Sequence, residues 1–260
     1  MLYTFGGIIF IFMMTTLGAA TVFFFKKEIS NNIQKIFLGF AAGIMIAASV
    51  FGLILPSLEA AKNLGFIPWI PTSIGFFIGA ATILILDKIV PHLHPSTNKI
   101  EGISSSMKRT SLLITAVTLH NIPEGMAVGL AFSLAAQNPD NSSLLTAATG
   151  LALGIGIQNF PEGAAVSLPL RREGLSPKKS FIYGSLSGIV EPIFGAFTIL
   201  ITANTILAMP WLLSAAAGAM MYVVIEELIP EAHLGEDSDI GTVSVLAGFT
   251  IMMILDVALG

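Results

Sequence analysis

Long apolar runs, each free or almost free of charged residues, follow one another along the whole chain. They cover residues 2–25, 36–55, 70–86, 111–134, 144–168, 181–203, 206–229 and 240–259. A helix crosses a hydrocarbon core of about 30 Å with roughly 20 apolar residues, and each run is close to that length. The pattern predicts an all-α polytopic membrane protein with eight transmembrane helices, forming a single domain over residues 1–260.

The composition agrees with this fold class and limits which side chains can bind a metal. Hydrophobic residues make up 54% of the chain and charged residues 11%, whereas soluble domains carry about 25% charged residues. A water-soluble fold is therefore not expected. The chain has no cysteine, so any bound metal must be held by His, carboxylate, amide or thioether groups.

The basic residues predict the orientation of the helices. Eleven of the twelve Lys and Arg residues fall in the connections after the first, third and fifth runs, and the exception is Lys62. The positive-inside rule puts those connections in the cytoplasm and both termini on the extracytoplasmic side. Because no basic residue precedes the first run and Lys26 and Lys27 follow it, we expect a retained helix rather than a cleaved signal peptide. The expected location is the cytoplasmic (inner) membrane.

Short sequence matches suggest an internal repeat. Residues 41–45 (Ala-Ala-Gly-Ile-Met) resemble residues 216–220 (Ala-Ala-Gly-Ala-Met), and residues 85–87 (Ile-Leu-Asp) recur at 254–256. The first three runs would then be a copy of the last three. Since corresponding runs cross in opposite directions, this predicts a 3+2+3 arrangement with an inverted repeat, as in many secondary transporters. Such short apolar matches also arise by chance, so the repeat is a hypothesis.

Two versions of one hexapeptide lie inside the fourth and fifth runs. Residues 120–125 read His-Asn-Ile-Pro-Glu-Gly, and residues 158–163 read Gln-Asn-Phe-Pro-Glu-Gly. Side chains four residues apart share one helix face, so His120 stacks with Glu124, and Gln158 with Glu162. Asn121 lies within reach of the same face, as its counterpart in the second hexapeptide does. Each helix therefore offers a ladder of polar donors, and the glycines permit close helix approach.

A third carboxylate, Glu191, lies in the middle of the sixth run and precedes Pro192, and no run contains Lys or Arg. A charged side chain at the bilayer centre costs about 2.5–3.5 kcal/mol unless it is neutralised. The compensating charge must come from protons or a bound metal. Imidazole, carboxylate and amide oxygen together suit zinc, iron and manganese, whereas calcium and magnesium favour all-oxygen sites.

Several other polar residues have an ordinary structural explanation. Met45 is expected to pack against neighbouring helices, and Asp87 and Asp256, at the ends of runs, are expected to be solvated. His92, His94 and His233 are expected to lie in solvated loops, although the first two could form a weak metal-collecting pair. Glu226 and Glu227 are either an exit relay or interfacial charges.

The paired hexapeptides, the Glu191-Pro192 pair and the Glu-Glu-x-Ile-Pro-Glu at 226–231 resemble the ZIP (Zrt/Irt-like) family of divalent metal transporters, in particular its bacterial branch. The resemblance implies an elevator-like or rocking uptake carrier with two adjacent metal positions. It assigns the first position to Met45, His120, Glu124, Gln158 and Glu162. It assigns the second to Asn121, Asn159 and Glu191, with Glu124 and Glu162 shared. Some relatives carry Asp at the position of Asn159, so the second position should be less anionic here.

The sequence therefore predicts a transporter of zinc or a related ion (Cd²⁺, Fe²⁺ or Mn²⁺) as cargo, with no resident cofactor. The alternative is a proton-coupled carrier of an organic substrate, in which the carboxylates only relay protons. An enzyme is not expected, because the chain lacks a His-Glu-x-x-His pattern and a cysteine nucleophile. The expected partners are metal ions and the lipid bilayer, without nucleic acid. Whether the protein forms a homodimer is left open.

Overall fold

The computed structural model describes residues 2–24, 30–93, 100–101, 109–203, 205–232 and 239–259. The α-helices, in chain order, are α1 (Leu2–Ala20), α2 (Asn31–Ala47), α3 (Leu55–Asn63), α4 (Trp69–Ile89), α5 (Arg109–Gln137), α6 (Ser142–Arg172), α7 (Pro177–Ser187), α8 (Val190–Thr202), α9 (Met209–Val223), α10 (Ile229–Ala232) and α11 (Asp239–Leu259). Four short segments complete the helices: the 3₁₀ turns η1 (Thr21–Phe23) and η3 (Ile206–Ala208), and the π-helical turns η2 (Ala48–Ile54) and η4 (Val224–Leu228). The strands are β1 (His92–Leu93) and β2 (Ile100–Glu101).

The structure confirms the predicted helical membrane fold. Seven continuous helical segments in the described part of the chain are long and apolar enough to cross a membrane. Helix α5, with 29 residues, is also long enough, but it carries the first hexapeptide, whose polar residues lower its mean hydropathy. The large apolar side chains on the outside of the bundle, such as Phe77 on α4 and Leu200 on α8, are those that a lipid bilayer would cover.

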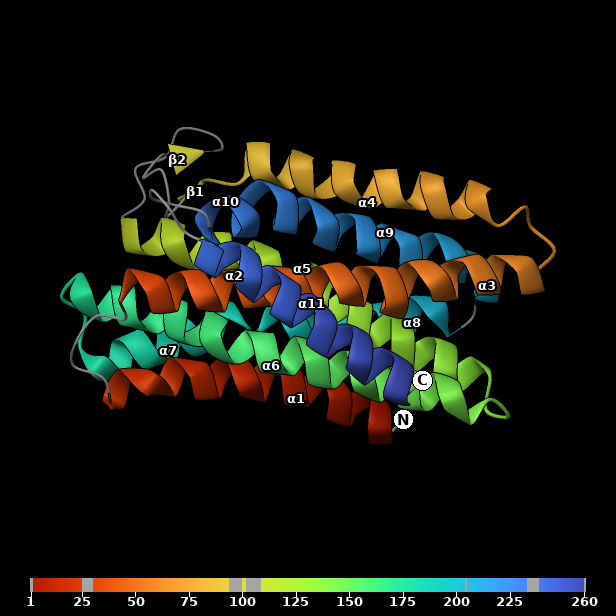
Figure 1. Cartoon of the computed structure of the whole chain (residues 1–260), viewed down its shortest axis with the longest axis horizontal. Coiled ribbons are helices and arrows are strands. Elements are labelled where there is room, and N and C mark those ends of the chain that lie inside the picture. Colours follow the sequence, from red (N-terminus) through yellow and green to blue (C-terminus); the bar gives the residue numbers. More distant parts are fainter. Residues whose placement is uncertain are drawn as a thin grey trace.

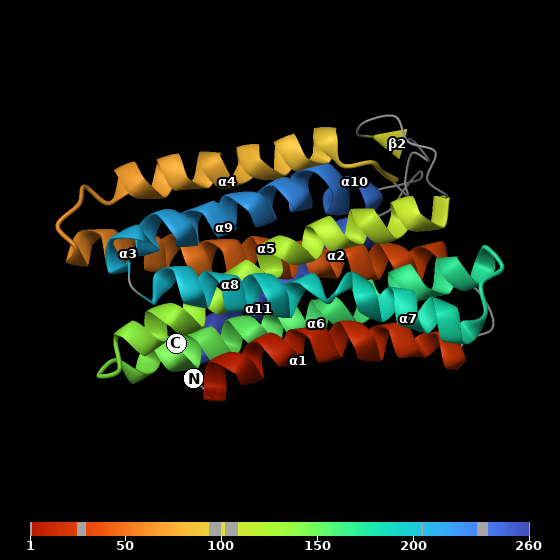
Figure 2. The same cartoon turned by 180° about the vertical axis from the view of Figure 1, so that it is seen from behind.

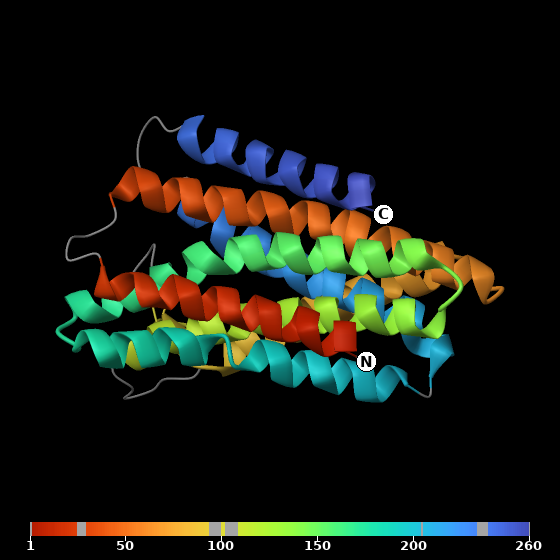
Figure 3. The same cartoon turned by 90° about the horizontal axis from the view of Figure 1, so that it is seen from below.

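The helices lie side by side along the long axis of the molecule (Figures 1 and 2). Helix α1 begins and α11 ends at the same end of the bundle, at the right in Figure 1. The start of α2, the ends of α4 and α6 and the start of α7 lie at the opposite end, toward the basic connections. The view from below in Figure 3 shows both termini toward the same end of the bundle, with other helices between them. The termini and the basic connections therefore lie at opposite ends, as the positive-inside argument requires.

The predicted inverted repeat is supported by the direction and the irregularities of α2 and α9. The two helices run in opposite directions (Figure 1). In each, the Ala-Ala-Gly-x-Met segment is followed by a π-helical turn, η2 or η4. Pro56 or Pro230 then lies at the second position of the next α-helix. Because proline has no N–H, the preceding turn loses one regular hydrogen bond, which is consistent with the wider π turn in both copies.

The sixth run lies in one span, Pro177–Thr202, as predicted, but a turn at residues 188–189 divides this span into two helices. Helix α7 ends at Ser187, and α8 begins at Val190. The physical reason lies in Pro192, which cannot donate to the carbonyl of Gly188, four residues earlier. The N–H of Glu191 donates to the Gly188 carbonyl instead, at 3.0 Å, forming a tight turn. The break leaves Glu191 in the first turn of α8.

The connection after α4 also differs from the expected simple loop. Residues 92–93 and 100–101 pair as a small antiparallel hairpin, in which His92 is opposite Glu101. The strand β1 packs against α5, so the start of this connection belongs to the folded bundle. His94 lies outside the described residues, as do His233 and part of the acidic connection before α11.

Candidate metal centre

The two hexapeptides lie in the middle of α5 and α6, which pack against each other. The glycine that ends each hexapeptide allows another helix to approach closely. A Cβ at Gly125 would overlap the backbone of Glu191 on α8, and a Cβ at Gly163 would overlap the carbonyl oxygen of Thr15 on α1. The prediction that these glycines permit close packing is confirmed, and α1 and α8 are the helices that they bring to the site.

The polar residues of the hexapeptides and Glu191 form a central cluster, defined as Asn121, Glu124, Gln158, Asn159, Glu162 and Glu191. The amide N–H of Gln158 donates to Oε1 of Glu124. Glu124 is also near enough to Glu162 and Glu191 for the charges to interact. Glu162 is half-buried, and the other members are buried. The carboxylates of three helices therefore face one another inside the bundle.

Five oxygens of the central cluster are buried without a hydrogen-bond partner in the described part of the chain. They are Asn121 Oδ1, Glu124 Oε2, Gln158 Oε1, Asn159 Oδ1 and Glu191 Oε2. Buried polar atoms are almost always paired, so a group of such acceptors needs a specific explanation. The Nδ2 of Asn159 is also buried without a partner in the same part of the chain, and it is a donor. The five oxygens are all acceptors, and a cation satisfies them together.

The orientation of the two side-chain amides follows from their partners. The Nδ2 of Asn121 donates to the Ser187 carbonyl at 3.1 Å, and the Nε2 of Gln158 donates to the Glu124 carboxylate. A carbonyl or carboxylate oxygen can only accept, so the nitrogen of each amide must face it. The amide oxygens are left for another group. Asn159 lies near both Glu124 and Glu191, but its amide atoms do not meet hydrogen-bond geometry with them.

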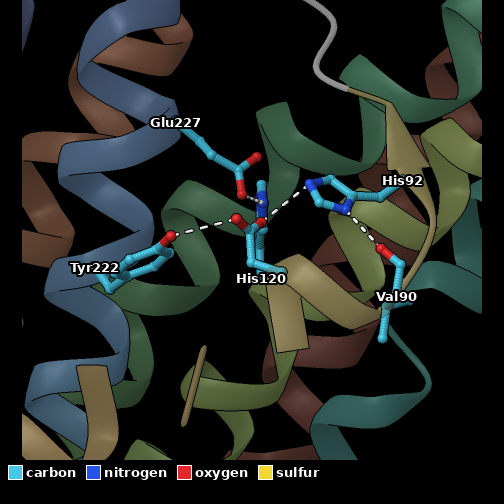
Figure 4. A network of polar contacts seen from close by, with 6 residues as sticks. Val90, His92, His120, Tyr222 and Glu227 are labelled. Atoms are coloured by element: carbon cyan, nitrogen blue, oxygen red, sulfur yellow. Dashed lines mark hydrogen bonds and ion pairs between the residues drawn. The ribbon is translucent and has the colours of Figure 1, made fainter. Parts of the chain in front are cut away.

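His120 connects the central cluster with the end of the bundle that carries the basic connections. Its Nε2 lies 2.6 Å from Oε1 of Glu227 on η4, and its charge also interacts with Glu162. Figure 4 shows Glu227 beside His120, with His92 and Tyr222 on either side. The predicted ligand His120 thus contacts a carboxylate for which the sequence left two roles open.

A second group of buried side chains lies beside this contact, and we call it the Asp87 cluster (Asp87, His92 and Glu227). One ligand atom from each residue lies within 4.8 Å of the other two, and the exposed fractions are 6%, 0% and 4%. The prediction that Asp87 and His92 are solvated is therefore wrong. The hairpin folds His92 back over the end of α4, which buries both side chains. No local sequence pattern indicates this contact.

The contacts of the Asp87 cluster fix the orientation of the His92 ring, with Nε2 as the nitrogen that can bind a cation. Its Nδ1 lies 2.9 Å from the Val90 carbonyl, and since that oxygen only accepts, Nδ1 carries the proton. The Nε2 atom faces Oδ1 of Asp87 at 3.0 Å, while Tyr222 donates to the other carboxylate oxygen at 3.3 Å. A backbone carbonyl that fixes one ring nitrogen of His is a common support for metal binding through the other.

The remaining predicted residues have different surroundings. Met45 is fully buried in the main apolar core, and the polar contacts that join the hexapeptides do not include it. Glu226 is exposed although Glu227 is buried. Asp256 is half-buried rather than fully solvated, and one of its carboxylate oxygens, Oδ1, is buried without a hydrogen-bond partner in the described part of the chain.

One contact of the site was missed at the sequence level. The hydroxyl of Thr15 donates to Oε1 of Glu191 at 2.7 Å, and both residues are fully buried. Thr15 lies inside an apolar run beside Thr16, where a hydroxyl usually bonds to its own helix. No spacing in the sequence connects it with a carboxylate 176 residues away.

The fold and these two clusters define the class of the protein: a polytopic membrane protein with a buried carboxylate and amide site suited to a divalent cation. The family model described as ZIP Zinc transporter matches residues 92–256. The chain belongs to this family, which confirms the resemblance of the paired hexapeptides.

Three relatives cover most of the chain. Zinc transporter ZIP11 of Homo sapiens is 35% identical and covers 98% of this chain and 96% of its own. Zinc transporter ZIPB of Bordetella bronchiseptica is 38% identical and covers 96% of this chain and 79% of its own. Zinc transporter ZupT of Escherichia coli is 33% identical and covers 86% of this chain and 84% of its own. All three names refer to zinc.

Proposed function

We propose that the protein carries zinc across the cytoplasmic membrane through the central cluster. The observation that carries this proposal is a cluster of three carboxylates and three side-chain amides with five unpaired buried oxygens, in apolar runs without Lys or Arg. A dication neutralises the carboxylates and satisfies the amide oxygens in one step. The zinc transporters among the relatives support the choice of cargo.

Within the central cluster, two adjacent metal positions agree with the contacts. Glu124, Gln158 and Glu162, with His120 and Met45, would hold the first ion. Asn121, Asn159 and Glu191 would complete the second and share the two motif carboxylates. The contact between His120 and Glu227 gives the first position a direct connection with the Asp87 cluster. We infer that an ion moves from the central cluster past His120 to the Asp87 cluster.

The direction of transport follows from the orientation of the bundle. The Asp87 cluster lies near the end of α4, at the end of the bundle with the basic connections. With those connections in the cytoplasm, ions released there enter the cell, and both termini are extracytoplasmic. The protein is then an uptake carrier of the inner membrane.

The chemistry of the donors favours zinc over hard cations. Imidazole beside carboxylates suits zinc, and cadmium, iron and manganese are further cargo of the same kind. Magnesium and calcium prefer sites made only of oxygen. The comparisons do not support a carrier of organic substrates, and a transporter without enzymatic activity agrees with the family.

Uptake into liposomes tests the proposed function. Purified protein in vesicles loaded with a zinc-sensitive dye should raise the zinc-dependent signal well above that of vesicles without protein. Cadmium added outside should compete, whereas an equal concentration of magnesium should not. A signal equal to that of protein-free vesicles would overturn the proposal.

Two neighbouring glutamates test the connection to the Asp87 cluster. Glu227→Gln removes a buried charge that contacts His120, whereas Glu226→Gln changes an exposed residue on the same turn. We expect Glu227→Gln to slow zinc uptake about 10-fold, the lower end of the effect of changing a partner of a metal ligand. Glu226→Gln should leave the uptake rate unchanged. Initial rates in liposomes measure both, and equal rates for the two variants would contradict the assigned route.

A further inference from the structure

The carboxylate of Glu191 is held at the break between α7 and α8. Its backbone N–H donates to the Gly188 carbonyl at 3.0 Å, and its side chain is fully buried. The two carboxylate oxygens have different environments. Oε1 accepts from the Thr15 hydroxyl at 2.7 Å, while Oε2 is buried without a hydrogen-bond partner among the described residues.

The Thr15 hydroxyl donates to this carboxylate and not to its own helix. A threonine has one O–H donor, and the other acceptor near it, the carbonyl of Ile11, is 3.4 Å away. A distance of 2.7 Å is typical of an O–H donor and an oxygen acceptor, and 3.4 Å is too long for one. The proton therefore lies between Thr15 and Glu191. In an apolar helix a hydroxyl would otherwise return to its own backbone.

Glycine residues leave the room that the Thr15–Glu191 pair needs. A Cβ at Gly188 would lie 2.8 Å from Oε1 of Glu191 and 2.9 Å from the Thr15 methyl carbon. A Cβ at Gly163 would overlap the Thr15 carbonyl oxygen. Helix α1 is thus packed directly against the second hexapeptide and the break before α8. Rotation of the Glu191 side chain would give up the hydrogen bond to Thr15.

We propose that Thr15 is a positioning residue of the metal site. Its hydroxyl fixes one oxygen of Glu191 and so directs the other, Oε2, toward the ion in the second metal position. Hydrogen bonds of this kind orient carboxylate ligands in metal sites, and losing one typically weakens metal affinity by about 10- to 100-fold. The inference rests on the proposed function and assigns to α1 a role in cargo binding.

Three single variants test this role by zinc binding to the purified protein, measured by titration calorimetry. Thr15→Val keeps the shape but removes the hydroxyl, and should weaken binding at one position by about 10- to 100-fold. Thr15→Ser retains the donor and should restore the affinity. Thr16→Val removes a neighbouring hydroxyl that has no hydrogen-bond partner among the described residues, and should bind as the wild type does.

A double variant distinguishes positioning from a general loss of structure. In a Glu191→Gln background, Thr15→Val should cause little further loss of affinity, because the residue that Thr15 positions no longer acts as a charged ligand. Equal affinity of Thr15→Val and the wild type would overturn the proposal, as would an undiminished effect in the Glu191→Gln background. If the wild-type protein itself binds no zinc, the proposed function fails instead, so the two failures are distinct.

Discussion

Replacing both motif carboxylates, in the variant Glu124→Gln with Glu162→Gln, is expected to reduce zinc uptake to the level of vesicles without protein. Both residues are assigned to both metal positions, so the variant leaves Glu191 as the one carboxylate of the central cluster. Glutamine keeps the size of each side chain and removes the charge, which makes this a test of electrostatics rather than of packing.

The same variant should not be less stable than the wild type in the absence of metal. One buried and one half-buried carboxylate are replaced by neutral groups, which removes the cost of keeping their charges in a low-dielectric interior. Zinc at about 100 times its dissociation constant should stabilise the wild type by about 2.7 kcal/mol. The double variant should lose this stabilisation, which a thermal unfolding series in detergent with and without zinc will reveal.

A matched control is available at Glu59, an exposed carboxylate on α3, a helix that lies at the other end of the bundle from β1 (Figure 1). Glu59→Gln changes the net charge in the same direction and should retain uptake and the zinc-dependent stabilisation. Full uptake by the variant without its two motif carboxylates would reject the central cluster as the pathway. Loss of uptake together with unfolding would instead indicate that the carboxylates have a structural role.

Adding one methyl group at Gly125 is expected to disable the metal site by disturbing the packing of α5 against α8. The Cβ of Gly125→Ala would overlap the Glu191 carbonyl oxygen and lie 2.7 Å from the Cα of that residue. These are backbone atoms, which cannot rotate away as a side-chain end can. Helices α5 and α8 must then separate, which moves Glu191 away from Glu124. Overpacking of this kind costs about 1–3 kcal/mol, and uptake should fall along with the stability.

The control for this variant is Gly6→Ala on α1, where a Cβ would meet nothing within 4 Å. Alanine is a better helix former than glycine by about 1 kcal/mol, so Gly6→Ala should be neutral or stabilising. Thermal unfolding and zinc uptake measured on both variants provide the comparison. If Gly125→Ala matched Gly6→Ala in both, the close contact between α5 and α8 would not be needed for transport.

Most of the fold could be predicted because its causes are local. Membrane spans depend on the length and polarity of continuous runs, and counting basic residues predicts which connections share one side of the membrane. The break in the sixth run was missed although Pro192 was visible, since proline bends some membrane helices without ending them. What decided between these outcomes was the turn that Glu191 makes with Gly188.

The central cluster could also be predicted, because each hexapeptide carries its polar residues on one face of a single helix. The duplication then indicated that the two faces meet. The contacts of Thr15 with Glu191 and of His120 with Glu227 connect helices that are far apart in the sequence, and no periodicity encodes such pairs. Their existence depends on how the helices pack.

The sequence by itself determined that this chain spans a membrane with acids but no Lys or Arg in its apolar runs, so that a cation has to compensate them. Only the tertiary structure decided which acids share a site and which polar residues are removed from solvent. Asp87 and His92 illustrate the difference: their neighbours in sequence are those of a solvated helix end, yet a short hairpin buries both beside Glu227. Burial is set by the approach of distant segments, and local composition does not contain that information.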